Sequence, residues 1–188
     1  MSNMCRRVNR GVTLVELIVF IVIVGLALAG LFAAFNTITA ASADPQVRKQ
    51  VLAIAESLMD EIALMPFTFC DPDDPAAATA TSTAGCATVE AIGPEAGETR
   101  YVAPQFDNVS DYHGFSMLAG IQDITNTTIG GLGAYSATIS VAQIALASGA
   151  DLIPATESLR ISVTVTGPGG VTATLEGYRT RYAPNTLP

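Results

Sequence analysis

The sequence predicts an α+β protein in which one long amino-terminal helix packs on a carboxy-terminal antiparallel β-sheet. Two patterns predict it: an apolar run that leads into helical periodicity, and late segments that alternate between apolar and polar residues. The 188 residues suffice for one ordinary domain and an appendage. Seventeen acidic against nine basic residues, a net charge of −8, argue against a nucleic-acid-binding surface, which needs clustered cations.

The apolar run extends from Leu17 to Phe35 without a charge, a polar amide or a proline. At about 1.5 Å per residue its length matches the hydrocarbon core of a bilayer, so the run predicts a transmembrane helix. Three arginines precede it, and the next cation along the chain is Arg48. This asymmetry predicts a cytoplasmic amino terminus, with everything after Phe35 on the other side of the membrane.

One carboxylate, that of Glu16, lies at the start of this apolar segment, five residues after Gly11. A charge at the centre of a membrane helix costs about 2.5–3.5 kcal/mol, so such a residue usually has a partner or a function. A glutamate near the helix end can also extend its carboxylate to the lipid headgroups, and position alone favours this simpler role.

The basic leader that ends in Gly11, the glutamate at the fifth following position and the apolar helix together resemble the class III signal of type IV pilins and pseudopilins. The resemblance implies that a prepilin peptidase and methyltransferase cleaves between Gly11 and Val12 and methylates the new amine. It further implies a pilin-like fold, in which Glu16 attracts the amine of Val12 of a neighbouring subunit during assembly. The motif departs from the family at Val12, where Phe or Met is usual.

A different targeting pattern follows the apolar run. Ala41, Ser42 and Ala43 form an A-x-A sequence that an ordinary signal peptidase can cleave, which would release a soluble protein beginning at Asp44. Against this alternative, the apolar run exceeds the usual signal-peptide core of about 7–15 residues.

The second half of the long helix is predicted to be amphipathic. Apolar residues recur at helical spacing, and charged residues, Glu61 among them, occupy the other face. The predicted buried stripe is Val47, Val51, Ile54, Leu58 and Ile62. Pro45 either begins this half or kinks a continuous helix.

Strands dominate the end of the chain. Residues 159–166 alternate in polarity, Gly167–Gly170 form a turn, and the alternation resumes at Val171. The parity of the pattern changes at Gly177, which predicts a bulge. Residues 135–146 form a third predicted strand. The predicted organisation is a leader at 1–11, a transmembrane and assembly helix at 12–35, and a head at 36–188 made of an amphipathic helix at 45–65, a loop region at 66–134 and a sheet at 135–182.

The cysteines predict one disulfide. Cys5 lies in the leader and leaves with it, so the mature chain keeps Cys70 and Cys86. Outside the inner membrane such a pair is oxidised, and the closed loop stabilises the fold by about 3 kcal/mol.

Chemistry-bearing residues are few, and no catalytic constellation follows from their spacing, so the sequence predicts neither an enzyme nor a cofactor. Asp71, Asp73 and Asp74 are weak candidates for calcium, although the neighbouring prolines fit a turn equally well. A second candidate group, for which turn capping is the simpler explanation, is Asp107, Asp111 and His113.

Within the family, two stretches are similar to minor pilins of the mannose-sensitive-haemagglutinin (MSHA) type: residues 43–75 and residues 106–115. This similarity implies a low-abundance subunit that helps initiate or cap a cell-surface pilus, with other pilins as partners. Two alternatives are a pseudopilin of a type II secretion system and a binding subunit at the fibre tip. The latter would use exposed aromatic residues of the loop region, for which the candidates are Tyr101, Phe106, Tyr112 and Phe115.

Overall fold

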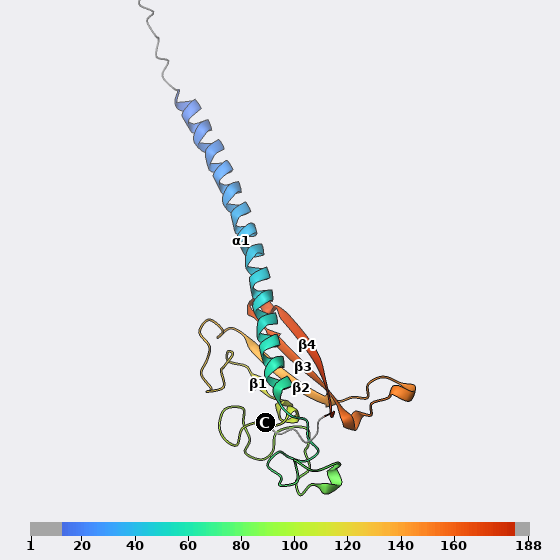
Figure 1. The fold of residues 1–188 in the computed structure, drawn as a ribbon. Helices are drawn as coiled ribbons and strands as arrows, with labels where there is room; N and C mark the ends of the chain where they lie inside the picture. Colours follow the sequence, from blue (N-terminus) through green and yellow to red (C-terminus); the bar gives the residue numbers. More distant parts are fainter. Residues whose placement is uncertain (1–12, 183–188) are drawn as a thin grey trace, which may run out of the picture. The chain divides into compact units, whose positions relative to one another are not determined.

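The computed structural model describes residues 13–182, and for residues 36–44 the backbone alone. Helix α1 runs from Leu14 to Leu64 with Pro45 inside it (Figure 1). The chain divides at this proline into two compact units, Met1–Asp44 and Pro45–Pro188. Pro45 therefore lies inside one continuous helix and does not begin a second one.

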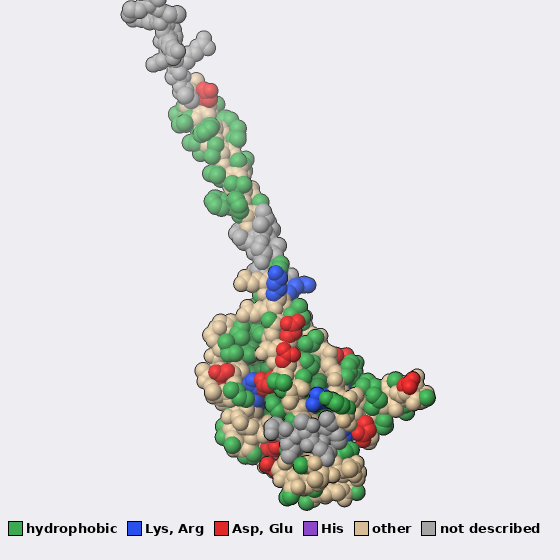
Figure 2. Space-filling view, in the orientation of Figure 1, with side chains coloured by type: hydrophobic (Ala, Val, Ile, Leu, Met, Phe, Trp, Pro, Cys, Tyr) green, Lys and Arg blue, Asp and Glu red, His purple; other side chains and the backbone are tan. Residues whose placement is uncertain are grey.

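The first part of α1 has no described packing partner within its unit. Every side chain from residue 13 to residue 35 is exposed, and hydrophobic side chains cover this segment in Figure 2. Leu14–Phe35 is long and apolar enough to cross a membrane. Because exposed apolar surface of this extent is unfavourable in water, the segment needs a bilayer or other apolar helices around it.

The sheet is a four-stranded antiparallel meander of order β1-β2-β3-β4. Its strands are β1 Ser116–Met117, β2 Ser136–Gln143, β3 Ser158–Thr166 and β4 Thr172–Thr180. Together with α1 they confirm the predicted α+β class. Strand β1 lies inside the predicted loop region. It was not predicted from the sequence, because two residues are too few to show an alternating pattern.

The predicted turn between the last two strands is present, but the predicted bulge is wrong. Gly167 N–H donates to the Val171 carbonyl at 2.8 Å, and β3 and β4 pair without interruption, Ile161 opposite Gly177. Tyr178 consequently stays on the exposed face. Gly177 lies on the face of β4 that packs against α1, since a Cβ built there would lie 2.8 Å from the sulfur of Met59. Glycine is therefore required at this position to leave room for Met59, and it does not mark a break in the strand.

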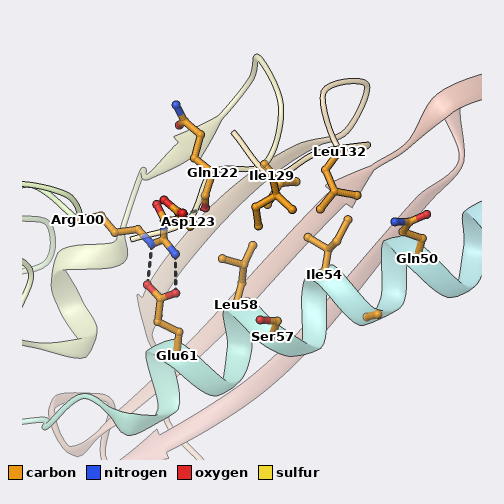
Figure 3. Close-up of a pocket in the computed structure, with 12 residues that line it drawn as sticks. Gln50, Ile54, Ser57, Leu58, Glu61, Arg100, Gln122, Asp123, Ile129 and Leu132 are labelled. Carbon is orange, nitrogen blue, oxygen red and sulfur yellow. Dashed lines mark hydrogen bonds and ion pairs between the residues drawn. The ribbon is translucent and has the colours of Figure 1, made fainter. Parts of the chain in front are cut away.

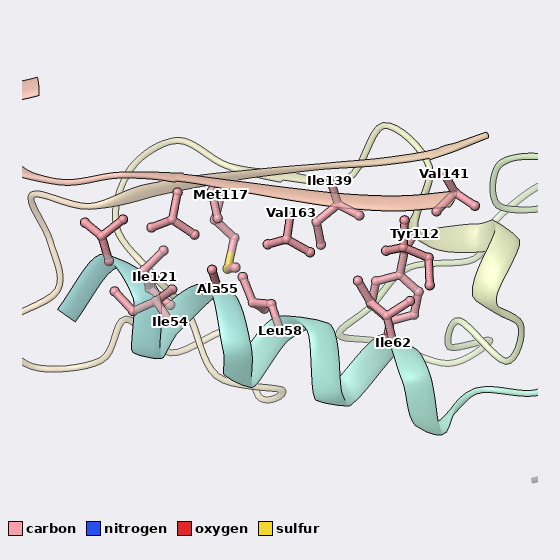
Figure 4. Close-up of a cluster of buried hydrophobic side chains, with 14 of the residues drawn as sticks. Ile54, Ala55, Leu58, Ile62, Tyr112, Met117, Ile121, Ile139, Val141 and Val163 are labelled. Atoms are coloured by element: carbon pink, nitrogen blue, oxygen red, sulfur yellow. The ribbon is translucent and has the colours of Figure 1, made fainter. Parts of the chain in front are cut away.

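The core lies between the second part of α1 and the inner face of the sheet (Figure 4). The predicted helix stripe is confirmed, since Val51, Ile54, Leu58 and Ile62 are buried and Val47 is half-buried. The sheet supplies alternate residues of β2 and β3: Ala137, Ile139, Val141, Leu159, Ile161, Val163 and Val165.

Gly167 marks the closest approach of the β3–β4 turn to the helix. A Cβ at this position would lie 2.9 Å from side-chain atoms of Val47, Val51 and Tyr135. Its φ of −109° and ψ of −178° are open to any residue, so steric contact alone requires glycine here.

The long stretch between α1 and β2 is irregular but tightly connected. It contains two 3-10 turns, η1 Thr83–Gly85 and η2 Val109–Tyr112. Three further 3-10 turns lie among the later strands: η3 Gly149–Asp151, η4 Ala155–Glu157 and η5 Pro168–Gly170. A disulfide joins Cys70 to Cys86, which closes a loop in a stretch with little regular structure.

Candidate functional site

The amino-terminal candidate site begins at the first turn of α1. Thr13 precedes the helix, and its hydroxyl oxygen accepts the backbone N–H of Glu16 at 3.3 Å. This is the position from which a threonine caps a helix. Glu16 therefore lies in the first turn, where the partial positive charge of the helix terminus favours a carboxylate. The predicted cleavage residues Gly11 and Val12, and Cys5 in the leader, lie outside the described residues.

Glu16 is isolated electrostatically along the sequence. Between Gly11 and Ala43 it is the only charged residue, and its side chain is exposed on a helix that is otherwise apolar. Within the membrane-length segment Leu14–Phe35 the sequence therefore offers Glu16 no cation with which to pair.

In the head, the predicted calcium candidates do not act as one group. Both oxygens of Asp74 hold the loop, accepting the N–H of Ala76 at 2.8 Å and of Thr88 at 2.6 Å. These bonds, that of Thr88 first, lower the pKa of Asp74. Asp71 and Asp73 instead have carboxylate oxygens within 4.8 Å of Asp107.

A second group of acids was not singled out in the sequence. Carboxylate oxygens of Glu90, Glu95 and Asp111 lie within 4.8 Å of one another. Burial, the largest cause, raises the pKa of Glu90 to about 9 although a hydrogen bond from Ser110 opposes it. Burial likewise raises the pKa of Asp111 to about 7. The sequence signal for this group was weak, because 21 residues separate Glu90 from Asp111 and the stretch between them has no periodic pattern.

The predicted group of Asp107, Asp111 and His113 does not form one site, because Asp111 and His113 bond to different parts of the fold. Oδ2 of Asp111 accepts the backbone N–H of Asp107 at 2.9 Å and of Asn108 at 2.7 Å, which is the capping role expected of a turn. The Nδ1 of His113 accepts the N–H of Val141 at 3.2 Å. The histidine thus joins the loop to β2 and is not directed into the acidic group.

An ion pair between α1 and the loops was missed by the sequence analysis. Arg100 donates from Nε and Nη2 to the two carboxylate oxygens of Glu61, both at 2.6 Å. Its Nη1 donates to the carbonyls of Gln122 and Asp123, each at 3.2 Å, and the Tyr112 hydroxyl donates to Glu61 at 2.9 Å. Glu61 therefore holds three loop segments on the helix, whereas the helical spacing of the sequence placed it on the charged face opposite the buried stripe. One signal was available, because Arg100 is the only Lys or Arg between residues 50 and 159.

This ion pair closes one end of an open groove of about 450 Å³ (Figure 3). Ile54 and Leu58 of α1 form one wall, and Ile129 and Leu132 form the other. Since the charged groups of Glu61 and Arg100 at its end are bonded to each other, the surface that the groove offers is mainly apolar.

The aromatic residues of the loop region do not form the predicted exposed platform. Tyr112 is buried, and Tyr101, Phe106 and Phe115 are half-buried. Phe106 packs edge-on against Tyr112 and Phe115, with ring centroids 5.1 and 5.8 Å apart. These rings contact one another, and their placement removes the specific basis for a sugar-binding surface there.

Comparison with known proteins adds one finding. A family model described as the prokaryotic N-terminal methylation motif matches residues 6–32. That segment contains Gly11, Glu16 and most of the apolar run. Neither curated proteins nor solved structures yield a match. The matched motif, with the exposed apolar helix behind it, supports a type IV pilin-like or pseudopilin precursor.

Proposed function

We propose that this chain is a minor type IV pilin of the MSHA type, most similar to minor pilin D, that helps to initiate or cap a cell-surface pilus. The observation that carries the pilin-type part of the proposal is the match of residues 6–32 to the methylation motif. The MSHA type rests on the similarity of residues 43–75 and 106–115. The leader, residues 1–11, is removed by cleavage between Gly11 and Val12. The apolar helix then holds the subunit in the inner membrane, with its head in the periplasm, until assembly.

The exposed helix supports assembly through helix–helix packing. From Leu14 to Phe35 no described side chain is buried, so the same surface that contacts lipid before assembly can contact the helices of other subunits afterwards. Gly25 and Gly30 have nothing within 4 Å of a built Cβ. Small residues of this kind let apolar helices approach closely.

Glu16 supplies the register of this packing. Cleavage creates a cationic amine at Val12, and an unpaired carboxylate in an apolar environment costs about 2.5–3.5 kcal/mol. Pairing with the amine of a neighbouring subunit removes that cost at one axial offset and leaves it in place at others. The position of Glu16 in the first helical turn keeps its carboxylate near the end at which that amine forms.

Processing is tested by co-expression with a prepilin peptidase. We expect the wild-type chain to shorten and its amino-terminal sequence to begin at Val12, whereas Gly11→Ala keeps the full length. Wild-type mobility that the peptidase does not change contradicts the proposal, and a first residue at Asp44 supports ordinary secretion instead.

Assembly is tested with Glu16→Ala and the matched control Val15→Ala, which removes an exposed apolar side chain one position away. We expect both variants to be cleaved, and only Glu16→Ala to disappear from the fibre fraction sheared from cells. Equal recovery of the two variants contradicts the role of Glu16.

The alternatives make different predictions about location. A type II secretion pseudopilin remains in a periplasmic filament and is absent from sheared surface fibres. A tip-located binding subunit appears at fibre ends, and its loss abolishes attachment without changing fibre number. Recovery of the chain in surface fibres, together with a reduced fibre number when it is deleted, supports the initiating role.

A further inference from the structure

The acidic group of Glu90, Glu95 and Asp111 is drawn from three segments of the irregular stretch. Glu90 N–H donates to the Phe69 carbonyl at 3.1 Å, which ties this residue to the disulfide loop. Glu95 lies in a turn closed by Glu98 N–H, which donates to the Glu95 carbonyl at 3.2 Å. Asp111 belongs to η2. The backbone of each of the three residues therefore belongs to a hydrogen-bonded segment of the fold.

Two of these carboxylates have one oxygen bonded and one without a donor among the described residues. Ser110 Oγ donates to Glu90 Oε1 at 2.6 Å, and Glu90 Oε2 is buried without a partner. Oδ2 of Asp111 accepts two backbone N–H groups, and its buried Oδ1 has no partner. The Asp111 residue is 0% exposed. Buried polar atoms are normally bonded, so each unbonded oxygen here calls for a partner of positive charge or a proton.

The surrounding charges strengthen this requirement. Asp107, whose Oδ1 is also buried without a donor, raises the pKa of Glu90 through its charge, after the larger effect of burial. Arg181 is a described cation that interacts electrostatically with Glu90. Its guanidinium is already used, since it donates to the Thr68 and Thr156 carbonyls and pairs with Glu157 at 3.4 Å.

We propose that Glu90, Glu95 and Asp111 bind one calcium ion, which links the disulfide loop, the turn at residues 95–98 and η2. The unbonded Glu90 Oε2 and Asp111 Oδ1, together with the carboxylate of Glu95, supply up to four oxygen ligands of the type that calcium prefers. Water can complete its coordination number of about six to eight. The flexible geometry of calcium suits ligands from three irregular segments better than the strict octahedron of magnesium does. The site differs from the sequence-predicted aspartates at residues 71–74, and it is independent of the pilin function proposed above.

Calcium titration of the full-length chain in non-ionic detergent at neutral pH tests this site. The protein is first stripped with a chelator, and CaCl2 binding is then followed by isothermal titration calorimetry and by the Tm of the head. We expect one ion per chain with saturation below about 10 mM, as for extracellular calcium sites, and a rise in Tm. MgCl2 at the same concentration should raise Tm less.

Three glutamine variants locate the ion. Glu90→Gln and Glu95→Gln should each weaken calcium binding by about ten-fold or more, because each removes one charged ligand. Glu56→Gln, an exposed acid on α1, is the matched control and should bind as the wild type does. Asp73→Asn, in the other acidic group, should also leave binding unchanged.

Glu95 is the more decisive of the two ligand variants, because its side chain is half-buried and the side-chain hydrogen bond that it makes is to Glu98, within the same turn. Far-UV circular dichroism of each variant establishes that it is folded before titration. The proposal is overturned if the folded wild type shows no saturable binding up to about 10 mM CaCl2. It is equally overturned if Glu95→Gln binds as tightly as Glu56→Gln, or if Asp73→Asn alone abolishes binding.

Discussion

Removal of the Glu61 carboxylate should be among the most damaging single changes to the head. Glu61→Ala deletes both acceptors of the Arg100 guanidinium, each at 2.6 Å. It also deletes the acceptor of the Tyr112 hydroxyl at 2.9 Å. The side chain of Arg100 is only 5% exposed, against 25% for Glu61. The variant therefore leaves a buried cation that keeps hydrogen bonds to the carbonyls of Gln122 and Asp123 and ring contacts to Tyr101 and Phe115, but no carboxylate.

The expected loss follows from this burial. Breaking a buried ion pair by removing one partner costs about 3–5 kcal/mol. The partial exposure of Glu61 lets water reach the site, so we expect the lower end, about 3 kcal/mol in the free energy of unfolding. Burial lowers the pKa of Arg100, but in the wild type the hydrogen bond and charge of Glu61 raise it by more. The variant loses these effects of Glu61, yet an arginine guanidinium does not give up its proton in proteins, so the buried charge remains. A loss of this size is a large fraction of the free energy of unfolding of a typical domain, which is about 5–15 kcal/mol.

Denaturant unfolding of the full chain in detergent measures the loss, with the near-ultraviolet circular dichroism of the tyrosines as the signal. Glu56→Ala, on an exposed face of the same helix, is the matched control and should change stability by less than about 0.5 kcal/mol. The double variant Glu61→Leu with Arg100→Met removes both charges, and we expect it to be more stable than Glu61→Ala. A Glu61→Ala chain as stable as Glu56→Ala would refute the reasoning.

Three further outcomes are expected. Gly167→Ala should destabilise the head by about 1–3 kcal/mol, because the added methyl group would clash with three side chains. Gly133→Ala is the control and should not destabilise it, because there is open space at its Cβ. Denaturant unfolding compares the two variants, and equal stability contradicts the packing argument. Replacing Cys70 and Cys86 together by serine should cost about 3 kcal/mol, and an unchanged unfolding midpoint would show that the loop is held by other contacts. With a chelator present, Tm should fall as pH rises from about 5 to 9. Glu90 has a pKa of about 9 in the folded state, so in this range it binds more protons in the folded state than in the unfolded state. A Tm that rises with pH contradicts this prediction.

Local patterns in the sequence were sufficient for the main elements. The apolar run and its flanking charges, the helical stripe of Val51, Leu58 and Ile62, and the alternation along β3 each depend on side chains only a few residues apart. Such patterns reflect the repeat of a single helix or strand, and they are therefore visible before the fold is known. The methylation motif is equally local, since it lies within residues 6–32.

The contacts within the irregular stretch required the tertiary structure. Glu61 and Arg100 are separated by 39 residues, and Glu90 meets Asp111 only because the disulfide loop and η2 are folded against each other. No period relates such residues, so their burial, their partners and their pKa values depend on how non-repetitive segments pack. Gly177 illustrates the same limit, because an alternating pattern cannot distinguish a strand break from a position where a helix side chain approaches the sheet.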